Sequence, residues 1–84
     1  MSKSDELFEE LGYKKKSESS NCILYEKNIS LSERSYIYFD LKEKLVQVED
    51  DDDDYEMREA SYINAQELQA IYQFYKEKGW LDEN

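Results

Sequence analysis

The sequence contains no proline and no histidine, and it has only one cysteine and two glycines. Without histidine, the common nucleophile–base pairs of enzymes lack their usual base. The single cysteine, Cys22, excludes an internal disulfide and is typical of a reducing compartment. Two glycines are too few for a glycine-rich phosphate loop. These shortages argue against an enzyme with a catalytic residue set or a cofactor and favour a binding protein.

Long apolar runs are also missing. No stretch approaches the ~20 apolar residues that a membrane helix needs, and residues 1–5 lack the apolar core of a signal peptide. We therefore expect a cytoplasmic protein that does not contact membranes. The 84 residues suffice for a single domain, 1–84, with a small core. Eight Tyr, three Phe and one Trp are too many for a typical disordered chain.

Basic residues are scarce and unevenly placed. The chain has a net charge of −10. Residues 1–48 have nine acidic and eight basic side chains, whereas residues 49–84 have twelve and three, a net of −9. The one basic cluster, Lys14 to Lys16, lies in a polar segment, 14–21, which we expect to be an exposed connection. This charge repels nucleic acid, so we expect no direct nucleic-acid binding, and it attracts basic protein surfaces.

Both glycines follow a helical pattern. Leu7, Phe8 and Leu11 form an apolar stripe before Gly12 and predict a helix over 4–11. Asn64 and Glu67 have the spacing of a capping box and start a longer helix, 65–78, which Gly79 ends. In each case an aromatic residue follows the glycine, as is common after a left-handed helix stop.

Between the helices the apolar period changes to two. Strands are predicted over about 22–27, 35–41, 45–48 and 59–63, with an acidic loop over 49–57. In the second strand, Ile37, Phe39 and Leu41 share one face, and Tyr36 and Tyr38 share the other. The pattern predicts an α+β fold: a three- to four-stranded antiparallel sheet with a short N-terminal helix and a longer C-terminal helix packed on one face.

The acidic run is the strongest feature of the sequence. As a calcium loop it fails, because an EF-hand beginning at Asp50 would have Tyr55 in place of the invariant glycine and Ser61 in place of the last glutamate. We predict no metal site. Two interpretations remain: a solvated loop that adds solubility, or an array of carboxylates that imitates nucleic acid and binds a basic groove. The array would comprise Glu49, Asp50, Asp51, Asp52, Asp53, Asp54, Glu56 and Glu59.

Tyr36 and Tyr38 give a second candidate binding surface. If the helices cover the Ile37 side, these tyrosines lie on the open face of the sheet, beside Tyr25 or Tyr62, and exposed tyrosines are frequent in interface hot spots. The alternative is that they pair across strands or cover a second small core. Stacking on RNA also uses open-face aromatics, but the basic rim that it requires is missing.

Several segments resemble a family of small proteins encoded by phages and prophages of Gram-positive bacteria. The similar segments are ELFEELGY at 6–13, ILYEK at 23–27, YIYFD at 36–40, and INAQELQAI at 63–71 followed by Gly79 and Trp80. The resemblance implies action inside a host bacterial cell. By analogy with small acidic phage proteins, it also implies inhibition of host enzymes that handle nucleic acid, such as CRISPR effectors.

From these features we expect a non-catalytic inhibitor, a monomer or homodimer, that binds a basic groove of a host nucleic-acid-binding protein through its carboxylate run. The alternative is an adaptor that binds a protein partner through Tyr36 and Tyr38, with the acidic loop serving solubility alone. A third interpretation is a homo-oligomer formed by pairing of edge strands.

Overall fold

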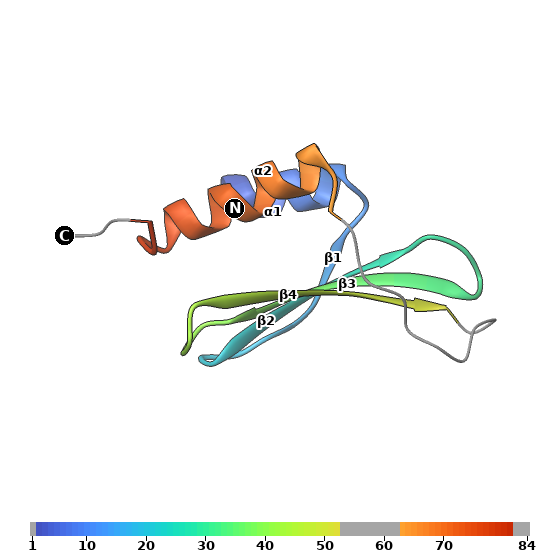
Figure 1. Ribbon diagram of the computed structural model, residues 1–84, viewed down its shortest axis with the longest axis horizontal. Coiled ribbons are helices and arrows are strands. Elements are labelled where there is room, and N and C mark those ends of the chain that lie inside the picture. The colour runs from blue at the N-terminus through green and yellow to red at the C-terminus, as the bar shows by residue number, and fades with distance from the viewer. Residues whose placement is uncertain (1, 53–62, 82–84) are drawn as a thin grey trace.

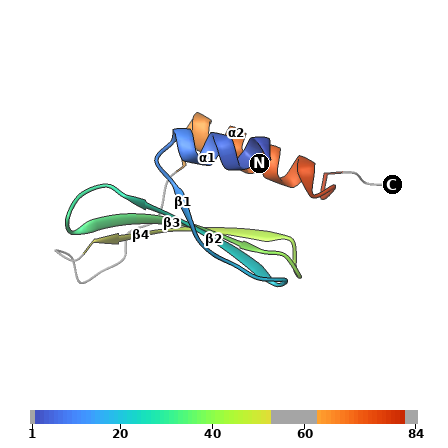
Figure 2. The same ribbon diagram turned by 180° about the vertical axis from the view of Figure 1, so that it is seen from behind.

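Four antiparallel strands form one sheet in the order of the chain, and both helices lie on the same face of that sheet (Figure 1). The computed structural model describes residues 2–52 and 63–81. Figure 2 shows the reverse side, where the first helix and the first strand are nearest the viewer. The α+β fold predicted from the sequence is confirmed. Its elements are α1 (Lys3–Glu10), β1 (Lys14–Glu18), β2 (Cys22–Asn28), β3 (Glu33–Asp40), β4 (Leu45–Asp52) and α2 (Ala65–Glu77).

The two helices begin and end as their capping residues predict. The Ser2 side chain accepts a hydrogen bond from the backbone of Asp5 and caps α1. Asn64 and Glu67 form the expected capping box at the start of α2. Gly12 and Gly79 have φ values of +95° and +74°, the left-handed region that favours glycine.

The core lies between the helices and the face of the sheet that carries Ile37 and Phe39. Both side chains are fully buried, and the Phe39 ring stacks on Phe74 of α2 with centroids 3.8 Å apart. Across β4, Val46 lies opposite Phe39 and Val48 opposite Ile37. The predicted alternation of β3 is therefore confirmed, and the opposite face of the sheet has no helix over it in the described part of the chain (Figure 1).

The segment 14–18 is a strand, and our prediction of an exposed connection there was wrong. Lys14 to Glu18 pair with β2 and form one edge of the sheet, with a bulge between Lys15 and Ser17. All five side chains are exposed. The segment shows no apolar alternation because neither face of this edge strand enters the core, so the usual sequence signal of a strand is missing.

The prediction of an acidic loop over 49–57 was also wrong for residues 49–52. Residues 49–52 extend β4 and pair with β3 from Tyr36 back to Glu33. Carboxylates in neighbouring positions of a strand point to opposite faces, so their mutual repulsion is smaller than in a tight turn. Residues 53–57 of the loop and 59–62 of the last predicted strand lie outside the described residues, and Ile63 is not in a strand.

Candidate functional site

The candidate site is the open face of the sheet, centred on Tyr36 and Tyr38 of β3. The register places Tyr36 between Glu26 of β2 and Glu49 of β4. Tyr38 lies between Leu24 of β2 and Gln47 of β4 in the same way. Tyr36 is half-buried and the side chain of Tyr38 is 37% exposed. The two rings therefore present both apolar surface and phenol groups to a partner.

A shallow hollow of about 360 Å³ forms at the centre of this face. Apolar parts of Leu24, Tyr36 and Tyr38 line it on one side, and Gln47 and Glu49 of β4 line it on the other. The Gln47 amide donates a hydrogen bond to Glu49 at 3.2 Å, which orients that carboxylate along the strand. The hollow can accept a flat or aliphatic side chain whose polar end reaches the β4 side.

The carboxylates of β4 do not share one face. Glu49 and Asp51 lie on the open face, opposite Tyr36 and Arg34, whereas Asp50 lies on the helix-covered face. There Asp50 accepts a hydrogen bond from the buried hydroxyl of Ser35 at 2.6 Å. Asp50 is therefore a structural residue of the covered face. Of the predicted acidic residues, Glu49 and Asp51 lie on the same face as Tyr36 and Tyr38. Asp52 ends β4, and Asp53, Asp54, Glu56 and Glu59 lie outside the described residues.

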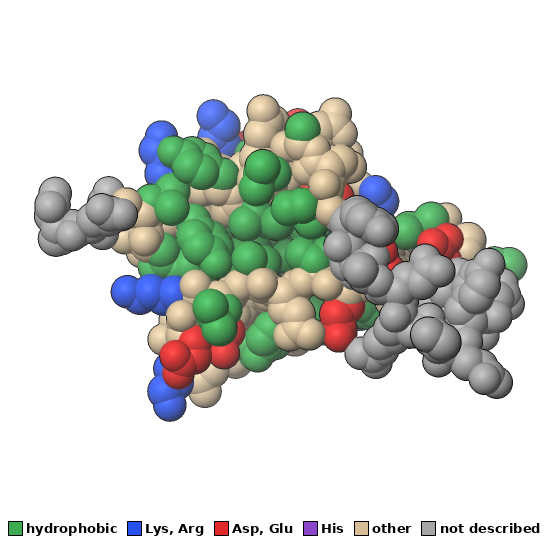
Figure 3. Space-filling view, in the orientation of Figure 1, with side chains coloured by type: hydrophobic (Ala, Val, Ile, Leu, Met, Phe, Trp, Pro, Cys, Tyr) green, Lys and Arg blue, Asp and Glu red, His purple; other side chains and the backbone are tan. Residues whose placement is uncertain are grey.

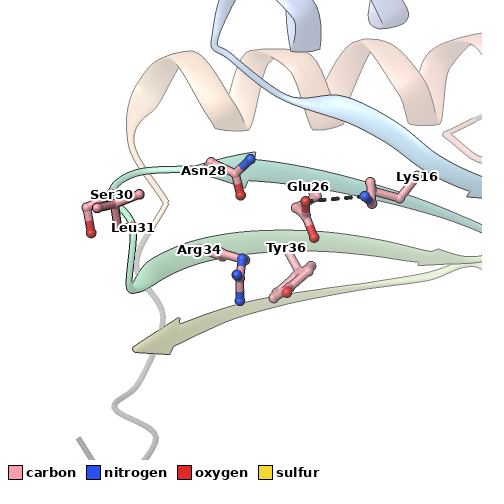
Figure 4. Close-up of a pocket in the computed structure, with 7 residues that line it drawn as sticks. All are labelled: Lys16, Glu26, Asn28, Ser30, Leu31, Arg34 and Tyr36. Carbon is pink, nitrogen blue, oxygen red and sulfur yellow. Dashed lines mark ion pairs between the residues drawn. The ribbon is translucent and has the colours of Figure 1, made fainter. Parts of the chain in front are cut away.

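A second groove, of about 530 Å³, continues the open face toward the turn between β2 and β3 (Figure 4). Lys16 of β1 and Glu26 of β2 form an ion pair of 3.6 Å at its upper side in the figure. Arg34 and Tyr36 of β3 lie below them, and Leu31, which is fully exposed, lies at the end of the turn. This groove therefore carries cations from β1 and β3 and a carboxylate from β2.

Cys22 lies on the same face and affects the phenol of Tyr38. Its thiol raises the pKa of Tyr38 above the ordinary value of 10.0, chiefly by hydrogen bonding. The O–H of Tyr38 is therefore directed to Cys22, and its oxygen can accept a hydrogen bond from a partner. Cys22 is half-buried in β2, as expected for a small apolar residue in a strand.

Tyr25 does not belong to the site, although the sequence allowed it to lie beside Tyr36 and Tyr38. It lies opposite Ile37 on the covered face and is 2% exposed. Its phenol donates a hydrogen bond to Asp5 of α1, and burial together with that carboxylate raises its pKa. Tyr62 lies outside the described residues.

Sequence reasoning missed the participation of Leu24, Gln47 and Arg34. Each lies across from, or next to, a predicted site residue only because of the strand register. The signal that identifies them is alternation, because residues at even spacing from Tyr36 and Tyr38 along each strand share their face. The sequence analysis treated the acidic run as a loop. The pairing of residues 49–52 with β3, and the register of that pairing, therefore could not be deduced from the sequence.

The chemistry of this face is that of recognition. Among residues 2–52 and 63–81, no group of three or more Asp, Glu or Cys side chains is placed to hold a metal ion. Two phenols, one amide and one carboxylate surround an apolar hollow, and this set of groups suits a lysine or arginine side chain of a partner.

Comparison of the chain with protein-family models, with curated proteins and with solved structures finds no match. Neither helix in the described ranges is long and apolar enough to cross a membrane.

Proposed function

We propose that this protein is a non-catalytic inhibitor that binds a basic surface of a host nucleic-acid-handling protein through the open face of its sheet. The observation that carries the proposal is the direct cross-strand placement of Tyr36 beside Glu49, on a face that no helix in residues 2–52 and 63–81 covers. A ring and a carboxylate side by side offer one cationic side chain both a π face and an ion-pair partner.

The tyrosines supply affinity and the acidic residues supply steering. Tyrosine buries a large, rigid surface at an interface and is enriched among hot spots. The net charge of −9 over residues 49–84 attracts a basic partner over longer distances and accelerates encounter. A CRISPR effector or another host defence enzyme has such a basic groove, and the resemblance to small phage proteins supports a target of this class.

The open-face carboxylates of β4 are not sufficient by themselves to imitate nucleic acid. Carboxylates on one face of a strand recur every second residue, about 6.8 Å apart. Duplex DNA carries one charge per ~1.7 Å of its axis. Glu49 and Asp51 are therefore too sparse to replace a phosphate backbone unaided. Asp53, Asp54, Glu56 and Glu59 would have to complete the array.

The experiment is to titrate a panel of purified CRISPR effectors and restriction enzymes with the protein and to measure their DNA binding. Tyr36→Ala combined with Tyr38→Ala should abolish inhibition of the target, whereas Tyr72→Ala, an exposed tyrosine on α2, should not. Glu49→Gln combined with Asp51→Asn should weaken inhibition and reduce its salt dependence. The matched control is Glu9→Gln with Glu10→Gln on the exposed side of α1. Inhibition that survives loss of both tyrosines would refute the proposed surface.

A second candidate function, an adaptor, is favoured by the apolar character of the hollow at Leu24, Tyr36 and Tyr38. In that case the tyrosine face binds a protein partner and the acidic run serves solubility alone. The same variants separate the two functions. An adaptor loses binding with the tyrosine variant and keeps full affinity, at every salt concentration, with the Glu49→Gln and Asp51→Asn variant.

A further inference from the structure

The two edges of the sheet carry opposite charges. The β1 edge holds Lys14, Lys15 and Lys16, and all of these side chains are exposed. The β4 edge holds Glu49, Asp50 and Asp51. Within the described ranges, neither strand has a second strand on its outer side. A protein of net charge −10 thus keeps its only lysine cluster on one sheet edge and begins its acidic run on the other.

The directions of the edge strands allow the sheet to continue from one molecule to the next. The sheet is antiparallel with four strands in chain order, so β1 and β4 run in opposite directions. If a second copy is placed beside the first with its helices on the same face, its β4 is antiparallel to β1. The new pair is therefore antiparallel, as are the three pairs within each sheet.

The side-chain faces also agree. Lys15 lies on the covered face, since it is opposite Tyr25, and Asp50 lies on that face opposite Ser35. Lys14 lies opposite Glu26 in the strand register, and the side chain of Lys16 forms an ion pair with the same glutamate. Both lysines therefore lie on the open face, with Glu49 and Asp51. One antiparallel register joins all three pairs: Lys14 opposite Asp51, Lys15 opposite Asp50, and Lys16 opposite Glu49 of the second copy.

We propose that β1 of one molecule pairs with β4 of a second copy in this register, so that the sheet extends from molecule to molecule. Each junction brings three lysines opposite three carboxylates, and opposite charges directly across a strand pair are favourable. The contact is head-to-tail, so each added molecule leaves a free edge for the next and the oligomers grow with protein concentration. The junction uses Glu49 and Asp51, which also belong to the proposed inhibitory surface, but its test needs no inhibited target and stands or falls separately.

Charge disfavours the symmetric alternatives. Pairing of β1 with β1 places lysines opposite or near lysines, and pairing of β4 with β4 does the same with carboxylates. Lysines on an edge strand normally block pairing with other chains. Here they would block every edge except one with carboxylates in the matching register, so they select the partner.

Apolar surface lies beside the β4 edge and supplies a further reason for contact. Val46, Val48, Tyr75 and Trp80 pack against the core but are only partly buried. Figure 3 shows hydrophobic side chains exposed between the helix layer and the sheet on this side of the molecule. In a continued sheet, α1 of the second copy extends the helix layer next to α2, as α1 does within one molecule, and covers part of this area.

Existing ion pairs and net charge do not prevent the junction. Lys15 lies 3.5 Å from Asp5 and 3.4 Å from Glu18. Lys15 is exposed, and a solvent-exposed ion pair contributes little to stability, so Lys15 can change partners at little cost.

The repulsion between two molecules of charge −10 acts mainly between distant groups. At about 0.15 M salt the Debye length is about 8 Å, so this repulsion is largely screened while the directly opposed pairs are not.

The test is sedimentation velocity at about 0.15 M salt, at low and high protein concentration. The wild type should gain mass as concentration rises. Two charge-reversed variants, Lys14→Glu with Lys16→Glu and Glu49→Lys with Asp51→Lys, should each remain monomeric. Both leave the Asp50–Ser35 bond in place. An equimolar mixture of the two variants should associate again, because each then presents the edge that the other needs. That recovery also shows that both variants are folded.

The control is Lys42→Glu with Lys44→Glu in the exposed turn between β3 and β4, which changes the net charge as much as the β1 variant does. It should associate like the wild type. A wild type that stays monomeric at high concentration, a mixture that stays monomeric, or a control that dissociates equally would each overturn the proposal.

Discussion

The phenol of Tyr13 donates a 2.5 Å hydrogen bond to the carboxylate of Glu67, 54 residues later in the chain. Tyr13 is 1% exposed and Glu67 is 8% exposed. The other oxygen of Glu67 accepts the backbone N–H of Asn64 in the capping box. One buried side chain thus joins the start of the sheet to the first turn of α2, and it fixes the helix layer over the covered face.

Replacing Tyr13 with Phe removes this bond and leaves one oxygen of a buried carboxylate without its donor. A hydrogen bond to a charged group contributes about 1.5–3 kcal/mol, so the free energy of unfolding should fall by that amount in urea denaturation. Tyr72→Phe, at a 58% exposed position, should change it by less than about 0.5 kcal/mol. Equal effects of the two variants would contradict the structural role of Tyr13.

The backbone N–H and the hydroxyl of Ser4 donate hydrogen bonds to the carboxylate of Glu77. These bonds should make the free energy of unfolding fall at acid pH. Burial acts to raise the pKa of Glu77, but hydrogen bonds from Gln73 and Ser4 outweigh it and lower the pKa below the ordinary 4.5. A lowered pKa in the folded state means that the stabilisation is complete above the unfolded value and is lost as pH falls through the folded value.

The midpoint of urea denaturation should therefore decline as pH falls below about 4.5. In Glu77→Gln that decline should be smaller, since the variant has no carboxylate to protonate. Asp5, whose pKa is also lowered through Tyr25 and Lys15 against the effect of burial, should account for part of the decline that remains. An identical pH profile in the wild type and in Glu77→Gln would show that the bonds between Ser4 and Glu77 do not contribute.

Lys44 is the one residue other than glycine with a positive φ, 60°, in the described ranges. The left-handed conformation costs an ordinary L-residue about 1–2 kcal/mol, whereas glycine adopts it without that cost. Lys44→Gly should therefore raise the free energy of unfolding by about 0.5–1 kcal/mol after the loss of chain entropy is included. Lys42→Gly, in the same turn, should lower it instead. The backbone carbonyl of Lys44, which accepts a hydrogen bond from the Tyr75 hydroxyl, is unchanged in Lys44→Gly.

Loss of the open-face tyrosines should affect binding far more than folding. Tyr36 and Tyr38 lie outside the core cluster. A cross-strand pair contributes roughly 0.2–1 kcal/mol, so Tyr36→Ala with Tyr38→Ala should lower the free energy of unfolding by no more than about 2 kcal/mol. Phe39→Ala, one position further along β3 but on the covered face, should cost about 3–5 kcal/mol. Thermal denaturation of the three proteins measures this difference between the faces.

Local signals were sufficient to predict the helices and the central strand. Asn64, Glu67 and the two glycines fixed the helix ends, because capping depends on residues that are near in sequence. The alternation around Ile37 and Phe39 predicted which face of β3 is buried, and hence that Tyr36 and Tyr38 share the other face.

Long-range pairing could not be predicted from the same signals. Lys14 to Glu18 and Glu49 to Asp52 are strands because their backbones complete an existing sheet, and their polar side chains gave no alternation to detect. The division of Glu49 and Asp51 from Asp50 follows from that pairing, so the composition of the candidate site depended on it too. Intrinsic strand preference is weak compared with the context that a neighbouring strand provides.

Hydrogen exchange on a complex tests the central claim most directly. The protein would be bound to a purified nucleic-acid-handling enzyme that it inhibits, and the protection of backbone amides would be compared with that of the free protein. Binding through the open face predicts added protection in β2, β3 and β4 around Leu24, Tyr36, Tyr38 and Glu49, with α1 and α2 unchanged. Protection confined to the helices, with the amides around Tyr36 and Tyr38 exchanging as in the free protein, would contradict the account.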